Sequence, residues 1–140
     1  MKIDAKAISP PITDRGAIEK EKIGEGPTSV VFKGRYNQRQ VAVKKLKAAN
    51  ARALILLRSE AMHQQNITSP HIVQCYGWVD SPDGPCLLLE LCPQGSLDKW
   101  IGKLTVKQKI MAIRCVALGL YDLHRHLIAH RNLSAANVFI

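Results

Sequence analysis

A short polar segment near residue 140 carries two asparagines that could take part in chemistry. It reads His130-Arg131-Asn132-Leu133-Ser134-Ala135-Ala136-Asn137. An asparagine carbonyl accepts hydrogen bonds, but the amide has no useful basicity near neutral pH. Asn132 can therefore orient a hydroxyl group without being able to remove its proton.

Two upstream segments supply residue types that suit a phosphate site. Gly24-Glu25-Gly26-Pro27-Thr28-Ser29-Val30-Val31 lies between two strand-like stretches, and Val41-Ala42-Val43-Lys44 alternates like a half-buried strand. Phosphoryl transfer spreads negative charge over oxygens, so it needs a cation, backbone donors, metal ions and a carboxylate base. Lys44 supplies the cation. We expect Glu60, on a following helix, to hold Lys44 extended, because an unpaired ammonium stem samples many rotamers.

In this order, the motifs resemble those of the eukaryotic protein kinase domain, nearest to its tyrosine kinase and tyrosine-kinase-like branches. The resemblance runs from about Ile18 to Ile140. It implies an α+β fold: a five-stranded antiparallel small lobe with one helix, then the first helices and catalytic loop of an incomplete large lobe. The implied divisions are a leader or linker at 1–14, the small lobe with its hinge at 15–92, and the truncated large lobe at 93–140.

The resemblance also implies an ATP-binding site. Leu89 matches the gatekeeper, the backbones of Glu90 and Cys92 would face the adenine edge, and Phe139 would support the ring from below. The complete implied set is Ile23, Gly24, Glu25, Gly26, Pro27, Thr28, Ser29, Val30, Val31, Ala42, Lys44, Leu89, Glu90, Cys92 and Phe139.

Within the family, the implied catalytic positions are Lys44, Glu60, Asn132 and Asn137. Asn132 replaces the aspartate that deprotonates the substrate hydroxyl, which makes the loop degenerate. General-base assistance contributes about 10² to 10⁴ in rate, so only traces of transfer are expected. Asn137 matches a metal position, but the sequence lacks Asp-Phe-Gly, so we expect Mg²⁺ to bind weakly. Gln64 stands where the family usually has an apolar spine residue, and it needs hydrogen-bond partners there.

Three functions remain open from the sequence. The preferred one is a pseudokinase-type module that binds nucleotide and a protein partner without efficient transfer. The alternatives are a truncated part of an active kinase, which transfers the ATP γ-phosphate to a protein hydroxyl, and a non-functional fragment. A zinc site at His124, His126 and His130 is disfavoured, because their spacing straddles a helix end and no cysteine lies nearby in sequence.

Composition narrows the other partners. The formal net charge is +9, but the basic residues are scattered and aromatics are few, so we expect no nucleic-acid partner. No run approaches the roughly 20 apolar residues of a membrane span, so we expect no membrane contact. The four cysteines form no Cys-x-x-Cys pair, which favours free thiols and a cytoplasmic location.

Periodicity predicts the elements that position the site. Five strand-like segments are expected at Ile18 to Ile23, Ser29 to Gly34, Gln40 to Leu46, Ile72 to Trp78 and Cys86 to Leu91, with a turn at Pro82-Asp83-Gly84-Pro85. A helix is expected from Ala51 to about Gln65, with Asn50 as its cap. A second helix from Thr105 carries an apolar stripe, expected to be core or to need a protein partner: Ile110, Ile113, Val116, Ala117, Leu120 and Leu123.

Overall fold

The computed structural model describes residues 21–36, 38–48, 50–81 and 84–140. The expected leader at 1–14, residues 18–20 of the first expected strand and Pro82-Asp83 of the expected turn lie outside them. The described chain forms two compact units. The first comprises the described residues up to 66 together with 75–91, and the second comprises 67–74 and 92–140.

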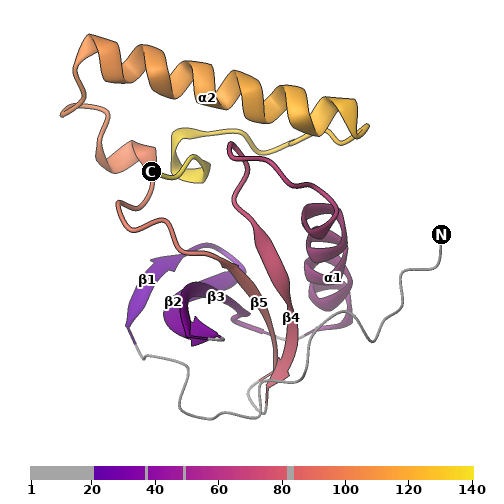
Figure 1. Ribbon diagram of the computed structural model, residues 1–140. Helices are drawn as coiled ribbons and strands as arrows, with labels where there is room; N and C mark the ends of the chain where they lie inside the picture. The colour runs from indigo at the N-terminus through magenta and orange to yellow at the C-terminus, as the bar shows by residue number, and fades with distance from the viewer. Residues whose placement is uncertain (1–20, 37, 49, 82–83) are drawn as a thin grey trace. The chain divides into compact units, whose positions relative to one another are not determined.

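The first unit is a five-stranded sheet with one helix, α1 (Figure 1). Its strands are β1 (Lys22–Glu25), β2 (Ser29–Tyr36), β3 (Arg39–Leu46), β4 (Cys75–Ser81) and β5 (Gly84–Glu90). They lie in the order β1-β2-β3-β5-β4, and every neighbouring pair is antiparallel. This arrangement confirms the predicted small lobe.

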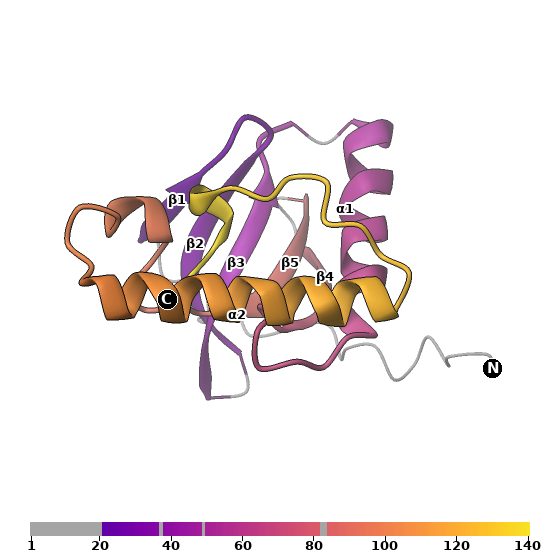
Figure 2. The same cartoon turned by 90° about the horizontal axis from the view of Figure 1, so that it is seen from above.

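Alternation along the strands separates two apolar clusters, because successive side chains point to opposite faces. On one face, the buried residues are Val41, Val43, Val79, Cys86 and Leu88. On the other face, Cys75 and Leu87 pack with Leu57 and Ala61 of α1. The helix lies against β4 and β5, as Figures 1 and 2 show. The second cluster therefore fixes α1 on the face of the sheet that also carries Lys44.

Helix α1 spans Ala51–Gln65, as predicted. Asn50 caps it, because the Ala53 backbone N–H donates to Asn50 Oδ1 at 2.8 Å. Leu57 and Ala61, one turn apart, are its buried residues. The buried side is narrow, and this leaves large apolar residues elsewhere on the helix in contact with solvent.

The predicted bounds of β4 and β5 were wrong. Cys75 pairs with Leu89, and a register shift follows between Cys75 and Gly77. Since β5 ends at Glu90, the apolar residues Ile72 and Val73 have no strand to pair with, so β4 begins three residues later than expected. At its other end, β4 continues to Ser81, where it pairs with Gly84, so two residues of the expected turn, Gly84 and Pro85, belong to β5.

The second unit contains the long helix α2 (Val106–Arg125) and two short 3₁₀ turns, η2 (Leu97–Lys99) and η3 (Ala135–Asn137). A reciprocal capping box starts α2: Gln108 N–H donates to Thr105 Oγ1, and Thr105 N–H donates to Gln108 Oε1. Thr105 is thus the N-cap, and the helix begins one residue later than the sequence predicted.

The expected apolar stripe of α2 is only partly core. Leu123 is buried, and Val116 and Leu120 are half-buried, but Ile110 and Ile113 are 60% and 69% exposed. Helix α2 has apolar residues on two sides, and the side that carries Gly119 and Leu123 is the one that is covered. The expectation that this helix exposes an apolar face is therefore met at Ile110 and Ile113.

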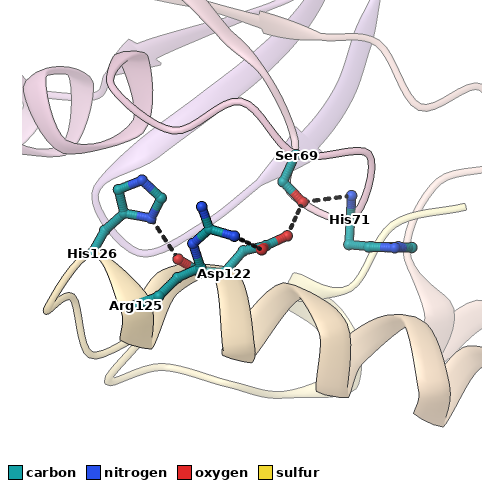
Figure 3. Close-up of polar contacts among 5 residues, drawn as sticks. All are labelled: Ser69, His71, Asp122, Arg125 and His126. Carbon is teal, nitrogen blue, oxygen red and sulfur yellow. Dashed lines mark hydrogen bonds and ion pairs between the residues drawn. The ribbon is translucent and has the colours of Figure 1, made fainter.

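Residues 67–74 fold back on α2 (Figure 3). Ser69 Oγ donates a hydrogen bond to Asp122 Oδ2 at 2.5 Å and accepts one from the His71 backbone N–H at 3.0 Å. Asp122 Oδ1 lies 3.9 Å from an Arg125 guanidinium nitrogen. These contacts attach the loop to the last turns of α2.

Replacing Gly119 with alanine should destabilise this unit. A Cβ at Gly119 would lie 2.9 Å from the His71 carbonyl oxygen, which is closer than van der Waals contact permits. Gly→Ala inside a helix normally gains about 1 kcal/mol, but here overpacking should cost about 1–3 kcal/mol. Urea unfolding of Gly119→Ala measures the change. Gly102→Ala is the matched control, since nothing lies within 4 Å of its Cβ position; equal stability of the two variants would contradict the close packing.

Candidate functional site

The Lys44–Glu60 ion pair is the centre of the site in the first unit. Lys44 Nζ on β3 lies 2.8 Å and 2.9 Å from the two carboxylate oxygens of Glu60 on α1. The side chains are 23% and 38% exposed, so the pair sits at the edge of the core rather than in open water. The carboxylate restricts the ammonium to one position, as expected from the sequence.

Strand register places several predicted site residues on one face of the sheet. Val31 is opposite Lys44, and Ala42 is opposite Leu89. Residues directly opposite each other in an antiparallel pair point to the same face, and so do residues two apart, such as Ala42 and Lys44. An apolar surface with one fixed cation therefore lies on this face.

The glycine-containing segment forms a hairpin between β1 and β2. Gly24 is paired with Val31, and the Gly26 N–H donates to the Ser29 carbonyl at 2.8 Å. The Lys47 N–H donates to the Thr28 carbonyl at 2.9 Å, which ties the loop to the end of β3. Ser29, at the position of the third glycine in the family motif, is buried. Its side chain therefore adds little obstruction on the exposed side of the loop.

Glu25 is held by two lysines. Its carboxylate forms ion pairs with Lys22 and Lys47. The hydrogen bond from Lys22, then that from Lys47, and their charges lower the pKa of Glu25 from 4.5 to about 2. Glu25 therefore stays ionised, and any nucleotide contact at this position falls to its backbone rather than its side chain.

A cavity of about 90 Å³ lies next to the ion pair. Its lining consists of Thr28, Ser29, Lys44, Leu46, Ala53, Leu56, Leu57 and Glu60. Pockets that hold drug-sized ligands are roughly 300–1,000 Å³, so this cavity is too small for a nucleoside. Leu46, Ala53 and Leu56 were not predicted as site residues, because they come from separate segments and share no motif.

Cys75 is buried beside this region, and its thiol should be inert. Burial, with a smaller effect from the Glu60 charge, raises the pKa of Cys75 from 9.0 to about 11. The thiol therefore stabilises the fold fully below pH 9, and this contribution is lost as the pH rises from 9 towards 11. At about pH 8, iodoacetamide and mass spectrometry should find exposed Cys115 alkylated long before Cys75. Equal rates in the folded chain would contradict this burial.

The second unit holds the predicted loop residues. The Asn137 side-chain N–H donates to the Asn132 backbone carbonyl at 2.8 Å. The Asn132 N–H approaches the His130 carbonyl at 2.9 Å and His130 Nδ1 at 3.3 Å, while Arg131 takes a positive φ of 61°. The loop is therefore closed by its own hydrogen bonds, and neither asparagine amide can serve as a base.

Cys92 and Phe139 also belong to the second unit, whereas Leu89 and Glu90 belong to the first. Phe139 forms an isolated β-bridge with Ser96 and is 48% exposed. The Gly95 N–H donates to the Cys92 carbonyl at 3.2 Å, and the Ile140 N–H donates to the Gly95 carbonyl at 2.9 Å. The segment after Cys92 and the residues that follow Asn137 are thus joined within this unit.

Gln64, one turn beyond Glu60, has a buried Oε1 that accepts no hydrogen bond from the described residues. A polar side chain at this position was expected to need such a partner. A buried amide oxygen without a donor costs about 1–3 kcal/mol, so Gln64 weakens this part of the first unit.

Within residues 21–36, 38–48, 50–81 and 84–140, no three His, Cys, Asp or Glu side chains come close enough to form a metal site. His126 Nδ1 lies 2.7 Å from the Asp122 carbonyl oxygen. In the same part of the chain, no helix combines the length and apolar character needed to cross a bilayer.

Comparison with known proteins gives consistent matches. A family model described as "Protein kinase domain" matches residues 18–140. Mitogen-activated protein kinase kinase kinase dlk-1 of Caenorhabditis briggsae is 28% identical over 123 residues, which cover 86% of this chain and 14% of that protein. A probable serine/threonine-protein kinase of Dictyostelium discoideum is 31% identical over 137 residues, covering 88% and 10%. L-type lectin-domain containing receptor kinase V.5 of Arabidopsis thaliana is 28% identical, covering 90% and 21%. The aligned part of the chain thus covers between 10% and 21% of the length of these relatives.

Proposed function

Since the chain belongs to the protein kinase domain family, we propose that it is a pseudokinase-type module that binds ATP and a protein partner without efficient phosphoryl transfer. The observation that carries this proposal is the Lys44–Glu60 ion pair, which fixes a cation on the sheet face that Val31 and Ala42 share. A positioned ammonium is what a polyphosphate needs most from the protein.

The proposed nucleotide contacts are those named from the sequence. In the first unit, Val31 and Ala42 would cover the adenine ring, Leu89 would serve as gatekeeper, and the segment from Ile23 to Ser29 would lie over the phosphates. The Glu90 backbone, also in the first unit, would contact the base. Cys92 and Phe139 belong to the second unit, and their assignment to the base rests on the family resemblance alone. The shared face of Val31, Ala42, Lys44 and Leu89 supports this assignment.

The proposed lack of transfer follows from Asn132. The loop holds its shape through Asn137, but it presents amides where proton removal requires a carboxylate. Asn137, the residue that matches a metal position of the family, is a neutral amide, and a neutral amide alone binds Mg²⁺ poorly. We therefore propose ATP binding that depends little on magnesium.

A specific observation favours a second function, part of an active protein kinase. The relatives are named as kinases, and those whose names specify a residue are serine/threonine-protein kinases. On this alternative, serine or threonine is a better acceptor than tyrosine, and the assignment to the tyrosine kinase and tyrosine-kinase-like branches remains a proposal. The third hypothesis is that the chain is a non-functional fragment.

We also propose the domain boundaries, the cellular location and the excluded partners that the sequence led us to expect. They comprise the boundaries at 1–14, 15–92 and 93–140, a cytoplasmic location, and the absence of nucleic-acid and membrane partners. A protein partner on α2 is supported by its exposed apolar residues, among them Val106, Ile110, Ile113 and Tyr121. Removing that surface from water is the driving force for such contact.

A phosphoryl-transfer assay distinguishes the pseudokinase proposal from the active-kinase alternative. The purified chain is incubated with [γ-³²P]ATP, magnesium and a generic protein acceptor, and labelled protein and released phosphate are measured. We expect no label above the level without the chain, because Asn132 supplies no base. Label that disappears in Lys44→Met but persists in Lys45→Met would contradict the pseudokinase proposal and establish a working kinase.

A further inference from the structure

The side of α1 that faces away from the sheet carries large apolar residues. Ile55, Leu56 and Met62 are 67%, 62% and 65% exposed, although the helix packs Leu57 and Ala61 into the core. Ile55 and Met62 are seven positions apart, so they lie on the same side of the helix, two turns apart. We call the exposed surface formed by Arg52, Ile55, Leu56, Arg58 and Met62 the outer face of α1.

The charges on this face have one sign. Arg52 and Arg58 flank the apolar residues and are exposed. The single carboxylate of α1, Glu60, lies one turn after Leu56, and it is already engaged by Lys44. The Arg58 guanidinium carbon lies 5.3 Å from the centre of the Trp78 ring, a cation–π contact that limits the freedom of the side chain. The guanidinium nitrogens can still make paired contacts with a carboxylate.

The cavity beside the ion pair adjoins this face, because Leu56 belongs to both. Leu46, Ala53, Leu56 and Leu57 give most of its wall an apolar character. Its volume of about 90 Å³ is smaller than the roughly 150 Å³ cavity that accepts benzene, and it suits one aliphatic side chain. Such a pocket next to an exposed apolar strip is the form that an anchor site takes at protein interfaces.

We propose that the outer face of α1 is a docking surface for an acidic amphipathic segment of another protein. An aliphatic anchor of that segment enters the cavity beside Leu56, its apolar side covers Ile55 and Met62, and its carboxylates pair with Arg52 and Arg58. This surface is separate from the apolar residues of α2, and the proposal does not depend on nucleotide binding.

Charge argues against the two occupants that this chain could supply. Residues 1–20 contain four basic and three acidic side chains, Lys2, Lys6, Arg15 and Lys20 against Asp4, Asp14 and Glu19. A second copy carries a formal charge of +9 and would meet like charge at Arg52 and Arg58. The positive charge of Arg52 and Arg58 attracts an acidic partner, whereas it repels residues 1–20 and a second copy of the chain, which both carry net positive charge.

The test uses the full chain and a fluorescein-labelled peptide of about 16 residues, roughly four helical turns, with leucines on one side and glutamates elsewhere. Fluorescence anisotropy should show saturable binding, and a scrambled peptide of equal composition should bind at least about tenfold more weakly. Ile55→Ser with Met62→Ser, and separately Arg58→Gln, should each weaken binding by a similar factor.

Two matched controls test whether the loss of binding is specific to the outer face of α1. Ile110→Ser with Ile113→Ser removes two equally exposed apolar residues from α2, and Arg35→Gln removes one exposed arginine from β2. Both controls should bind the peptide like the parent chain. Equal binding of the scrambled peptide, equal losses in the controls, or a dimer in sedimentation that Ile55→Ser with Met62→Ser dissolves would each overturn the proposal.

Discussion

Leu87→Ala is expected to lower the free energy of unfolding by about 2–5 kcal/mol, the range for truncating a fully buried leucine. Leu87 has 0% exposure and lies in the cluster with Leu57, Ala61 and Cys75, where β5 meets α1. The loss combines the transfer free energy of the removed methyl groups with the cost of the cavity left behind. Because domains are stable by only about 5–15 kcal/mol, the variant should unfold at a much lower urea concentration.

Leu56→Ala provides the matched control for this result. The substitution is chemically identical and lies in the same unit, but Leu56 is 62% exposed. Its effect should stay within about 0.5 kcal/mol of the parent chain. If the two variants unfolded at the same urea concentration, the cluster between the sheet and α1 would not be the core of this unit.

Lys44→Met should reduce ATP affinity more than any other single change in the first unit. The ammonium that Glu60 holds would be lost, and with it one charge-assisted contact to a phosphate. Hydrogen bonds to charged groups contribute about 1.5–3 kcal/mol, so affinity should fall roughly ten- to 150-fold. Equilibrium competition against a fluorescent ATP analogue measures the change.

Lys45→Met is the control for Lys44→Met. Lys45 is the next residue on β3 and points to the opposite face, where its Nζ lies 6.0 Å from the centre of the Phe32 ring. The substitution removes the same charge from the same strand. A loss of ATP affinity as large as that of Lys44→Met would mean that net charge, rather than a positioned ammonium, attracts the nucleotide.

The parts of the fold that could be predicted from sequence obey local rules. Asn50 predicted the start of α1, and this signal lies within one segment of the chain. The pairing of Lys44 with Glu60 was expected from the order of the kinase-like motifs, not from a local rule. The ion pair then follows from packing α1 on the face of β3 that carries Lys44.

The parts that could not be predicted depend on contacts between distant residues. The start of β4 is set by where β5 ends, and nothing between Ile72 and Gln74 indicates that end. Helix α2 has apolar residues on more than one side, and the close approach of His71 to Gly119 marks the covered side. The cavity beside Lys44 and the stacking of Arg58 on Trp78 combine segments that share no sequence motif.

The most direct test of the central claim is calorimetric titration of the folded chain with ATP, first without and then with magnesium. The proposed function predicts saturable binding that Lys44→Met abolishes or weakens at least about tenfold, with little change when magnesium is added. Absence of ATP binding to a chain shown to be folded would contradict the nucleotide site, and a large gain in affinity with magnesium would contradict the pseudokinase assignment.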